Sequence, residues 1–178
     1  SSAASDVYKR QEVNTMIIRR VTMDDLEEVV NLESAAFKMT KEQTKNDMMG
    51  RIENYPDTFL VAQEDGKVIG HIFGPAFNKR YIEDELYFEN HPNQKDDCYQ
   101  MVLSLAVLPE YRKQGVATKL IEAMTQEARK QNRQAISLTC LTKLIKFYEK
   151  RGFHNEGKTS DDIPDPTGVT SVNMIRAL

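Results

Sequence analysis

The chain has 178 residues, of which 40% are hydrophobic and 29% charged, a balance typical of one globular domain with a substantial core. The formal net charge of −3 excludes a general electrostatic attraction to nucleic acid or to an anionic membrane surface. Two cysteines make no disulfide framework, and no apolar run is long enough to cross a membrane, so we expect a cytoplasmic protein.

Residues 1–11 differ from the rest of the chain, because they are small or polar and lack hydrophobic periodicity. Within them Asp6–Gln11, DVYKRQ, matches the translation of a common sequencing adapter. We expect this tail to be adapter-derived, the alternative being a natural disordered N-terminus. Residues 12–178 are expected to form a single domain.

The first half of the domain is predicted to contain a strand, two helices and a hairpin. The strand covers Asn14–Val21, and the first helix follows Thr22 as N-cap with Asp25 as its capping-box partner. The second helix is expected at Lys41–Tyr55. The hairpin covers Asp57–Gly74, around an Asp-Gly turn.

The second half begins with residues 78–97, which are charged and are expected to be a long surface excursion. The pattern then predicts a buried strand at Cys98–Pro109 and a helix with an apolar stripe from Val116 to Ala128. A strand at Gln134–Cys140, a short helix from Leu141 to Tyr148 and a closing strand at Gly168–Leu178 are expected to follow. This order indicates one mixed α/β domain.

The segment Arg112–Ala117, RKQGVA, stands where the buried strand turns into the long helix. Gly115 permits backbone geometry that other residues avoid, and a helix N-terminus offers unpaired N–H groups with a partial positive charge. Arg112 and Lys113 add cationic side chains at the same end. The segment therefore suits a pyrophosphate, although an ordinary strand–helix turn with solvated charges explains the spacing equally well.

Two motifs resemble those of the GNAT superfamily of N-acetyltransferases. The series Arg112-x-x-Gly115-x-Ala117 is similar to its [QR]-x-x-G-x-[GA] signature, and Leu144–Phe153, LIKFYEKRGF, is similar to its second hallmark helix. The resemblance extends from about Asn14 to the C-terminus and is greatest to the arylalkylamine N-acetyltransferase-like branch. It implies a single-domain fold with a mixed sheet of about seven strands, flanking helices and a splayed cleft for acetyl-CoA.

The resemblance also implies which residues hold acetyl-CoA, the expected co-substrate. The backbone of Leu105, Ala106 and Val107 would pair with the pantetheine arm like an added strand. The pyrophosphate would lie at the turn begun by Arg112, on the amides of Lys113, Gln114, Gly115, Val116, Ala117 and Thr118. Transfer would be direct, so neither Cys98 nor Cys140 is needed as a nucleophile.

Tyr148 is the best candidate for a catalytic acid. The resemblance places a tyrosine at this position, where its hydroxyl can donate a proton to the departing thiolate of coenzyme A. The alternative is a core tyrosine, because Tyr148 also falls on the apolar stripe of its helix.

The general base is less well defined by the sequence. Two histidines of the vertebrate arylalkylamine enzymes correspond to Met101 and Leu103 here, which argues against their water relay. Glu33 is the substitute that we expect, because its spacing from Leu26 and Phe37 puts it on the apolar face of the first helix. A partly desolvated carboxylate there could accept the proton of an amine, although a structural glutamate at the helix edge is the alternative.

The acceptor is expected to be a small primary amine, either an arylalkylamine or a polyamine-like molecule, with Phe37 lining its pocket or simply packing. A peptide or protein amine is the first alternative, and a non-catalytic acyl-CoA-binding domain is the second. The three histidines lack metal-ligand spacing, so no metal is expected. Neither nucleic acid nor a membrane is an expected partner. The protein is expected to be a monomer or a homodimer.

Overall fold

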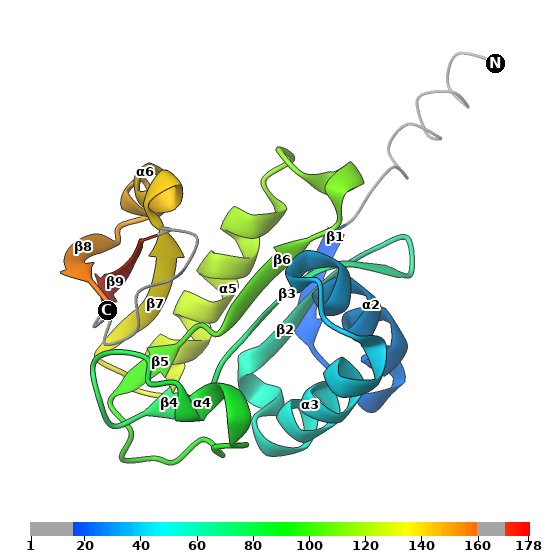
Figure 1. The fold of residues 1–178 in the computed structure, drawn as a ribbon, viewed down its shortest axis with the longest axis horizontal. Coiled ribbons are helices and arrows are strands. Elements are labelled where there is room, and N and C mark those ends of the chain that lie inside the picture. The colour runs from blue at the N-terminus through cyan, green and yellow to red at the C-terminus, as the bar shows by residue number, and fades with distance from the viewer. Residues whose placement is uncertain (1–15, 160–169) are drawn as a thin grey trace, which may run out of the picture.

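A computed structural model describes residues 16–159 and 170–178 of the chain. The strands are β1 (Met16–Arg20), β2 (Phe59–Glu64), β3 (Lys67–Phe73), β4 (Ala76–Phe77), β5 (Tyr99–Met101), β6 (Ser104–Val107), β7 (Ala135–Leu141), β8 (His154–Lys158) and β9 (Ser171–Ala177). The helices are α2 (Leu26–Phe37), α3 (Lys41–Asn54), α4 (Glu85–Phe88), α5 (Val116–Lys130) and α6 (Ile145–Glu149) (Figure 1). The tail 1–11 and the first residues of both terminal strand predictions lie outside the described residues.

The described strands form two sheets, with the orders β1-β2-β3-β6 and β4-β5-β7-β9-β8. All pairs are antiparallel except β5 with β7. The predicted α/β class is confirmed, and residues 16–159 and 170–178 contain nine strands in two sheets where about seven in one sheet were expected. None of the helices in the described ranges is long and apolar enough to span a bilayer.

The prediction of one strand over Cys98–Pro109 is wrong, because the chain changes sheets in the middle of it. The amide of Val102 donates to the carbonyl of Ser137 at 2.9 Å, in the second sheet. The next amide, that of Leu103, donates to the carbonyl of Phe73 at 2.8 Å, in the first sheet. Gly74 makes this crossing possible, since a Cβ atom at that position would overlap the carbonyl oxygen of Met101.

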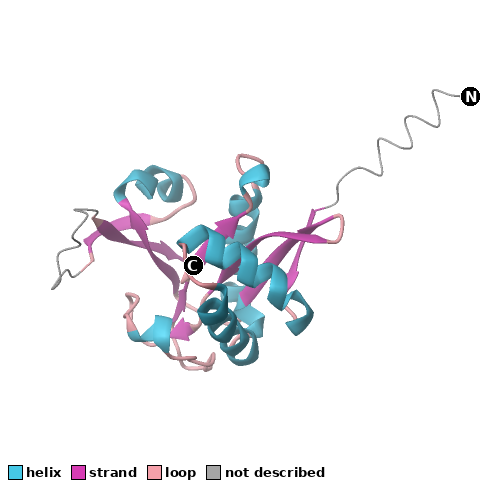
Figure 2. Cartoon of the chain, turned by 45° about the vertical axis from the view of Figure 1, so that its right-hand side comes forward, coloured by secondary structure: helices cyan, strands magenta, loops and turns pink. Residues whose placement is uncertain are grey.

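The helices cover both faces of the first sheet. Alternate side chains of β2 and β3 point to opposite faces, as strand geometry requires. One set, which includes Phe59, Val61 and Phe73, packs in a core cluster with α2 and α3. The other, which includes Leu60 and Ile72, packs with α5 and with strands of the second sheet. Figures 1 and 2 show α5 running along the junction of the two groups of strands.

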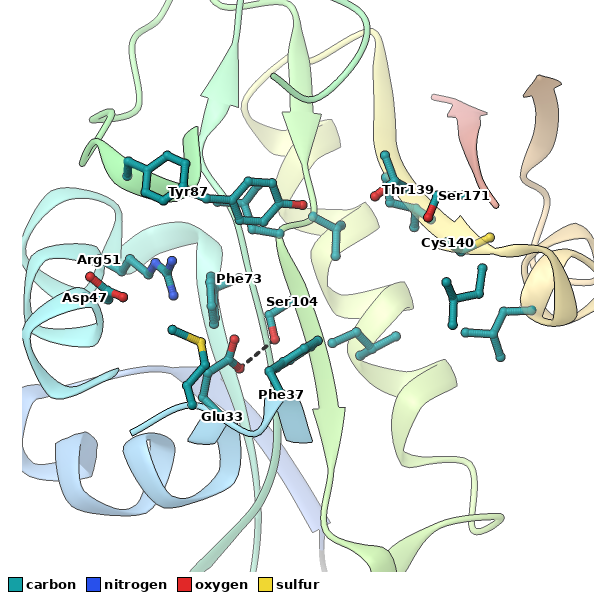
Figure 3. A pocket seen from close by; sticks show the side chains of 18 of the residues that line it. Glu33, Phe37, Asp47, Arg51, Phe73, Tyr87, Ser104, Thr139, Cys140 and Ser171 are labelled. Atoms are coloured by element: carbon teal, nitrogen blue, oxygen red, sulfur yellow. Dashed lines mark hydrogen bonds between the residues drawn. The ribbon is translucent and has the colours of Figure 1, made fainter. Parts of the chain in front are cut away.

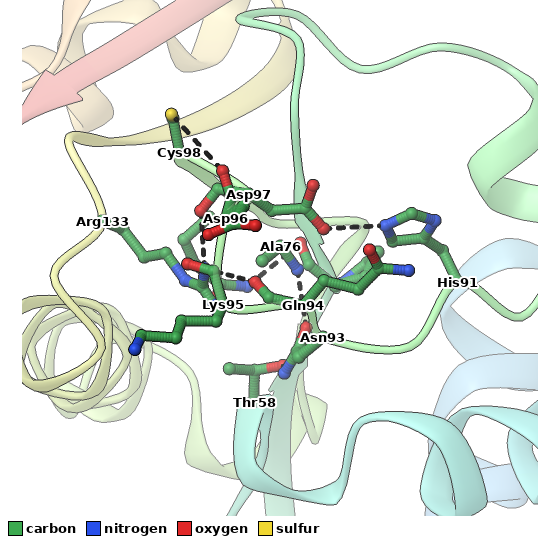
Figure 4. A network of polar contacts seen from close by, with 12 residues as sticks. Thr58, Ala76, His91, Asn93, Gln94, Lys95, Asp96, Asp97, Cys98 and Arg133 are labelled. Atoms are coloured by element: carbon green, nitrogen blue, oxygen red, sulfur yellow. Dashed lines mark hydrogen bonds and ion pairs between the residues drawn. The ribbon is translucent and has the colours of Figure 1, made fainter.

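The predicted surface excursion contains α4, and polar contacts fasten its end to the domain (Figure 4). The side-chain nitrogen Nδ2 of Asn93 donates to the carboxylate of Asp57 at 2.8 Å and to the hydroxyl of Thr58 at 2.9 Å. Arg133 donates to the carbonyl oxygens of Gln94 and Asp97. These bonds fix the position from which α4 reaches over the space between the sheets.

Candidate active site

A cavity of about 620 Å³ lies where the two sheets diverge. Its wall is built by side chains from α2, α3 and α4 on one side, and from β7 and α6 on the other, with β6 between them (Figure 3). The cavity therefore collects residues that stand more than 100 positions apart in the chain, including Glu33 and Tyr148.

β6 presents to this cavity a backbone edge that no other described strand pairs with. It pairs with β3 on one side and is the last strand of its sheet. The amide of Leu108 donates to the carbonyl of Ile69 at 2.8 Å, so the alternation of antiparallel pairing turns Ala106 toward β3. The N–H and C=O groups of Leu105 and Val107 consequently face the divergence. There the carbonyl of Val107 accepts from Nε of Arg112 at 3.4 Å, and the other groups could pair with an extended ligand.

The turn before α5 has the geometry of an anion site. Gly115 adopts the left-handed conformation, with φ of 81°, and a Cβ atom there would meet nothing within 4 Å. Lys113 also has a positive φ, of 63°. The amides of residues 113–118 have no hydrogen-bond partner in the part of the chain that the structure describes. The turn therefore presents a series of free donors at a positive helix end.

Arg151 fastens α6 to this turn. Its Nε donates to the hydroxyl of Thr118 at 2.8 Å, and its Nη1 donates to the carbonyl of Phe147 at 2.6 Å. The guanidinium also lies 3.6 Å from the centre of the Phe147 ring. The hydroxyl of Thr118 is thereby occupied, while its amide stays free.

Tyr148 is held beside the cavity by the ring of Phe153, whose centre is 5.5 Å away in an edge-to-face contact. Burial raises the pKa of Tyr148 to about 12, with a smaller contribution from Cys140 in the same direction and an opposing one from Arg151. The phenol is consequently protonated throughout the physiological range. It is thus available as a proton donor toward the cavity.

Glu33 lies buried at the wall of the cavity with two hydrogen-bond partners. Nε2 of His71 is 2.7 Å from its Oε2. The hydroxyl of Ser104 donates to the same oxygen at 2.7 Å, the contact that is drawn as a dashed line in Figure 3. Nδ1 of His71 has no partner among the described residues, so the tautomer with its proton on Nε2 suits the pair. Oε1 of Glu33 receives no hydrogen bond from the described residues and remains available to a ligand in the cavity.

Phe37 and Cys140 also line the cavity, from opposite sides. Phe37 is half exposed, so it stands at the mouth of the cavity. Burial raises the pKa of the Cys140 thiol, which makes the thiolate scarce and agrees with a passive role. Cys98 lies outside the cavity lining, and no group of residues in the described ranges could hold a metal ion.

Four residues in or behind the cavity wall, His71, Ser104, Tyr87 and Arg51, are not among the site residues that the sequence predicted. His71 and Ser104 meet Glu33 across 38 and 71 residues of sequence, so no local spacing could indicate the cluster. Tyr87 reaches the cavity from the excursion, which had no clear pattern (Figure 3). Arg51 did give a signal, because it stands three residues after the buried Met48 on the same helix face.

Comparison with known proteins agrees with this geometry. The model of the acetyltransferase (GNAT) family matches residues 26–153. The chain belongs to the GNAT family of acetyltransferases. A probable hydrolase of Bacillus subtilis is 24% identical, over 68% of this chain and 25% of the hydrolase. An uncharacterized N-acetyltransferase of Methanocaldococcus jannaschii is 30% identical, over 61% of this chain and 56% of that protein. The chain thus spans between a quarter and just over half of these relatives.

A solved structure has the same fold. The ribosomal-protein-S18-alanine N-acetyltransferase of Escherichia coli superposes with a TM-score of 0.67 at 17% identity, over 92% of this chain and 94% of its own. The single-domain α/β architecture of the GNAT family is therefore shared. These matches support the family and do not distinguish the arylalkylamine-like branch that the motifs resemble.

The environment of Tyr148 generates a stability prediction. Its folded pKa of about 12 exceeds the ordinary value of about 10, so the stability that the neutral phenol contributes is full below pH 10 and is lost as the pH rises toward 12. Relative to Tyr148→Phe, the native protein should lose about 1 kcal/mol of its free energy of unfolding between pH 9 and pH 11. Urea unfolding of both proteins across this range measures the difference, and parallel pH profiles would contradict the assignment.

Proposed function

We propose that this protein transfers an acetyl group from acetyl-CoA directly to a primary amine. The observation that carries the proposal is the meeting of three features at one cavity: the free edge of β6, the carboxylate of Glu33 and the phenol of Tyr148. The free amides of the turn before α5 complete the arrangement at a neighbouring position.

The residues present fit the donor. The turn offers amides for a pyrophosphate, and Leu105 and Val107 offer backbone groups for the two amides of a pantetheine arm. Arg112 and Lys113 add positive charge at the turn. Acetyl-CoA, when bound, supplies an activated thioester whose carbonyl carbon an amine can attack.

The chain's own groups then move two protons. Oε1 of Glu33 takes a proton from the acceptor's ammonium, and the donors on Oε2, His71 and Ser104, keep the carboxylate oriented. The nitrogen forms the new C–N bond as the C–S bond breaks. Tyr148 gives its proton to the leaving sulfur, because the neutral phenol predominates at physiological pH. The acylated nitrogen then loses its second proton, which restores the phenol, and Glu33 releases the first proton to solvent. In this proposal His71 is a positioning residue, since it contacts the base and lies behind it.

Small arylalkylamines and polyamine-like amines are the acceptors that we propose first. The aromatic side chains of Phe37, Tyr87 and Phe88 at the cavity favour an acceptor with an apolar body. A peptide amine is the second candidate, because Phe88 is 85% exposed at the same mouth and could contact a longer chain. The Escherichia coli structure of the same fold is named for such an acceptor.

Release of free thiol from acetyl-CoA, measured against a panel of small amines, polyamines and peptides, tests the proposal. Thiol release that depends on an amine, with the acetylated amine identified by mass spectrometry, is the expected result. Tight binding of acetyl-CoA without transfer to any member of the panel would favour a non-catalytic acyl-CoA-binding domain.

The donor site yields a prediction for Gly115→Glu. A side chain and a negative charge at the turn should block the pyrophosphate, and the affinity for acetyl-CoA should fall at least about tenfold. Gly66→Glu is a matched control, because Gly66 also has a positive φ with nothing within 4 Å, in the β2–β3 turn. Calorimetric titration with acetyl-CoA measures both, and unchanged affinity in a folded Gly115→Glu protein would refute the site.

The base yields a prediction for Glu33→Gln. The amide cannot take the acceptor's proton, so kcat/KM should fall about 10²-fold near neutral pH and lose the acidic limb of its pH profile. Glu28→Gln is the control on the same helix, because Oε2 of Glu28 accepts the amide of Val68 at 2.8 Å and is structural. A native profile in Glu33→Gln would return Glu33 to a structural role.

The acid yields a prediction for Tyr148→Phe, which keeps the ring and removes the hydroxyl. The value of kcat should fall about 10²-fold or more, while acetyl-CoA affinity stays nearly unchanged because the turn is intact. The loss should shrink with a thioester donor whose thiolate leaves more easily. Tyr81→Phe is the control, since its hydroxyl binds Glu156 at 2.7 Å and is absent from the cavity lining. Full turnover in Tyr148→Phe would defeat the role.

A further inference from the structure

Arg51 is a buried cation at the acceptor side of the cavity. It belongs to α3, is 8% exposed, and lines the same cavity as Glu33. Figure 3 shows its guanidinium directed toward Phe73 and the cavity interior, across from Thr139 and Cys140. The guanidinium is thus presented to whatever occupies this end of the cavity.

The protein supplies Arg51 with weak partners. Its Nη1 lies 3.6 Å from the sulfur of Met48, and its guanidinium carbon lies 4.7 Å from the centre of the Phe73 ring. The buried phenol of Tyr55 is a further neutral neighbour, and the guanidinium opposes the rise in the pKa of that phenol that burial causes. Arg51 makes no ion pair with any carboxylate in residues 16–159 or 170–178, although Asp47 stands one helical turn away. A guanidinium has five N–H donors, so most of them are left for a ligand.

Burying such a group is costly unless an anion compensates it. Arg133 is the other arginine or lysine in the described chain that is similarly buried, and its two terminal nitrogens donate to three carbonyl oxygens and to Gln131. Arg51 lacks this compensation and faces a cavity. The contrast indicates that its partner arrives with the substrate.

The surroundings favour a carboxylate over a phosphate. A single guanidinium binds a planar monoanion through two parallel hydrogen bonds. A dianionic phosphate would need further donors, and Asp47 and Glu33 on the same wall would repel it. The remaining neighbours, Phe73 and Tyr87, offer aromatic surface and suit an apolar body.

We propose that Arg51 determines acceptor specificity by binding a carboxylate carried by the acceptor itself, so that the substrate class is amino-acid-like. This inference rests on the proposed function, in which Glu33 receives the amine, and it narrows the small-amine acceptors proposed there to amines that also carry a carboxylate. Arg51 and Glu33 would then bind the two charged ends of one molecule. A free amino acid and a peptide with an acidic residue near its N-terminus both supply such a carboxylate.

The test compares matched acceptors that differ in the carboxylate. With saturating acetyl-CoA, kcat/KM is measured for each L-amino acid, for its α-amide and, for phenylalanine, for phenethylamine. At least one amino acid should exceed its amide by about 10- to 100-fold. Arg51→Met, which keeps a long side chain without charge, should abolish this preference and leave the amides nearly unchanged. Arg51→Lys should retain part of it, because the charge remains without the planar fork.

Two controls separate specificity from folding and from the peptide source. Arg20→Met removes a surface arginine paired with Glu127 and should leave every ratio unchanged. Peptides with Asp or Asn as the second residue form the other arm, and an Arg51-dependent preference for Asp in the peptides alone would assign the carboxylate to a peptide. Equal losses for acids and amides in Arg51→Met, or a native preference for amides in both arms, would overturn the inference.

A binding measurement keeps this inference distinct from the proposed function. N-acetylamino acids, the products, and their amides are titrated into native protein and Arg51→Met with coenzyme A present. Tighter binding of the acids, lost in Arg51→Met, would support the carboxylate site even if no thiol release were detected. Acetylation of amines with no Arg51-dependent preference in rates or binding would refute this inference while the proposed function stood.

Discussion

The structure depends on one change of hydrogen-bonding partner, at Val102 and Leu103. Consecutive amides there bond to different sheets, and from that point β6 and β7 separate. A sheet that continued to pair would satisfy the edge of β6 and leave no cavity. Because the pairing stops instead, polar backbone groups remain exposed inside the domain, where an unpaired group is costly unless water or a ligand meets it. The end of the pairing therefore creates both the cavity and the exposed backbone groups that a ligand in the cavity can bind.

Two of the domain's buried charged side chains, Glu33 and Arg51, line the cavity, and their surroundings differ. Glu33 is compensated within the protein, by His71 and Ser104 on one carboxylate oxygen. Arg51 is left with a thioether and an aromatic ring. Stability alone would favour apolar residues at such positions. Their presence on one wall, with aromatic side chains between, agrees with the amino-acid-like acceptor that we propose.

Much of the fold could be predicted from local pattern. The first helix begins with the capping box at Thr22, whose amide donates to Asp25 at 2.8 Å, and the β2–β3 hairpin turns at its Asp-Gly pair. The apolar spacing of α2 also put Glu33 on the inner face, and the structure buries it there. The break between β5 and β6 could not be predicted, because an unbroken apolar run looks the same whether its residues pair with one sheet or two. His71 was missed for a related reason, since its partner lies on a distant helix.

The contact of Arg151 with Thr118 has a consequence for motion. It joins α6, the helix that carries Tyr148, to the first turn of α5, so the motions of these two helix ends are coupled. Any ligand that orders the turn must therefore also narrow the range of positions open to the tyrosine. In the proposed reaction, Tyr148 therefore loses mobility when acetyl-CoA binds, before the chemical step. This favours an ordered mechanism in which acetyl-CoA binds before the amine.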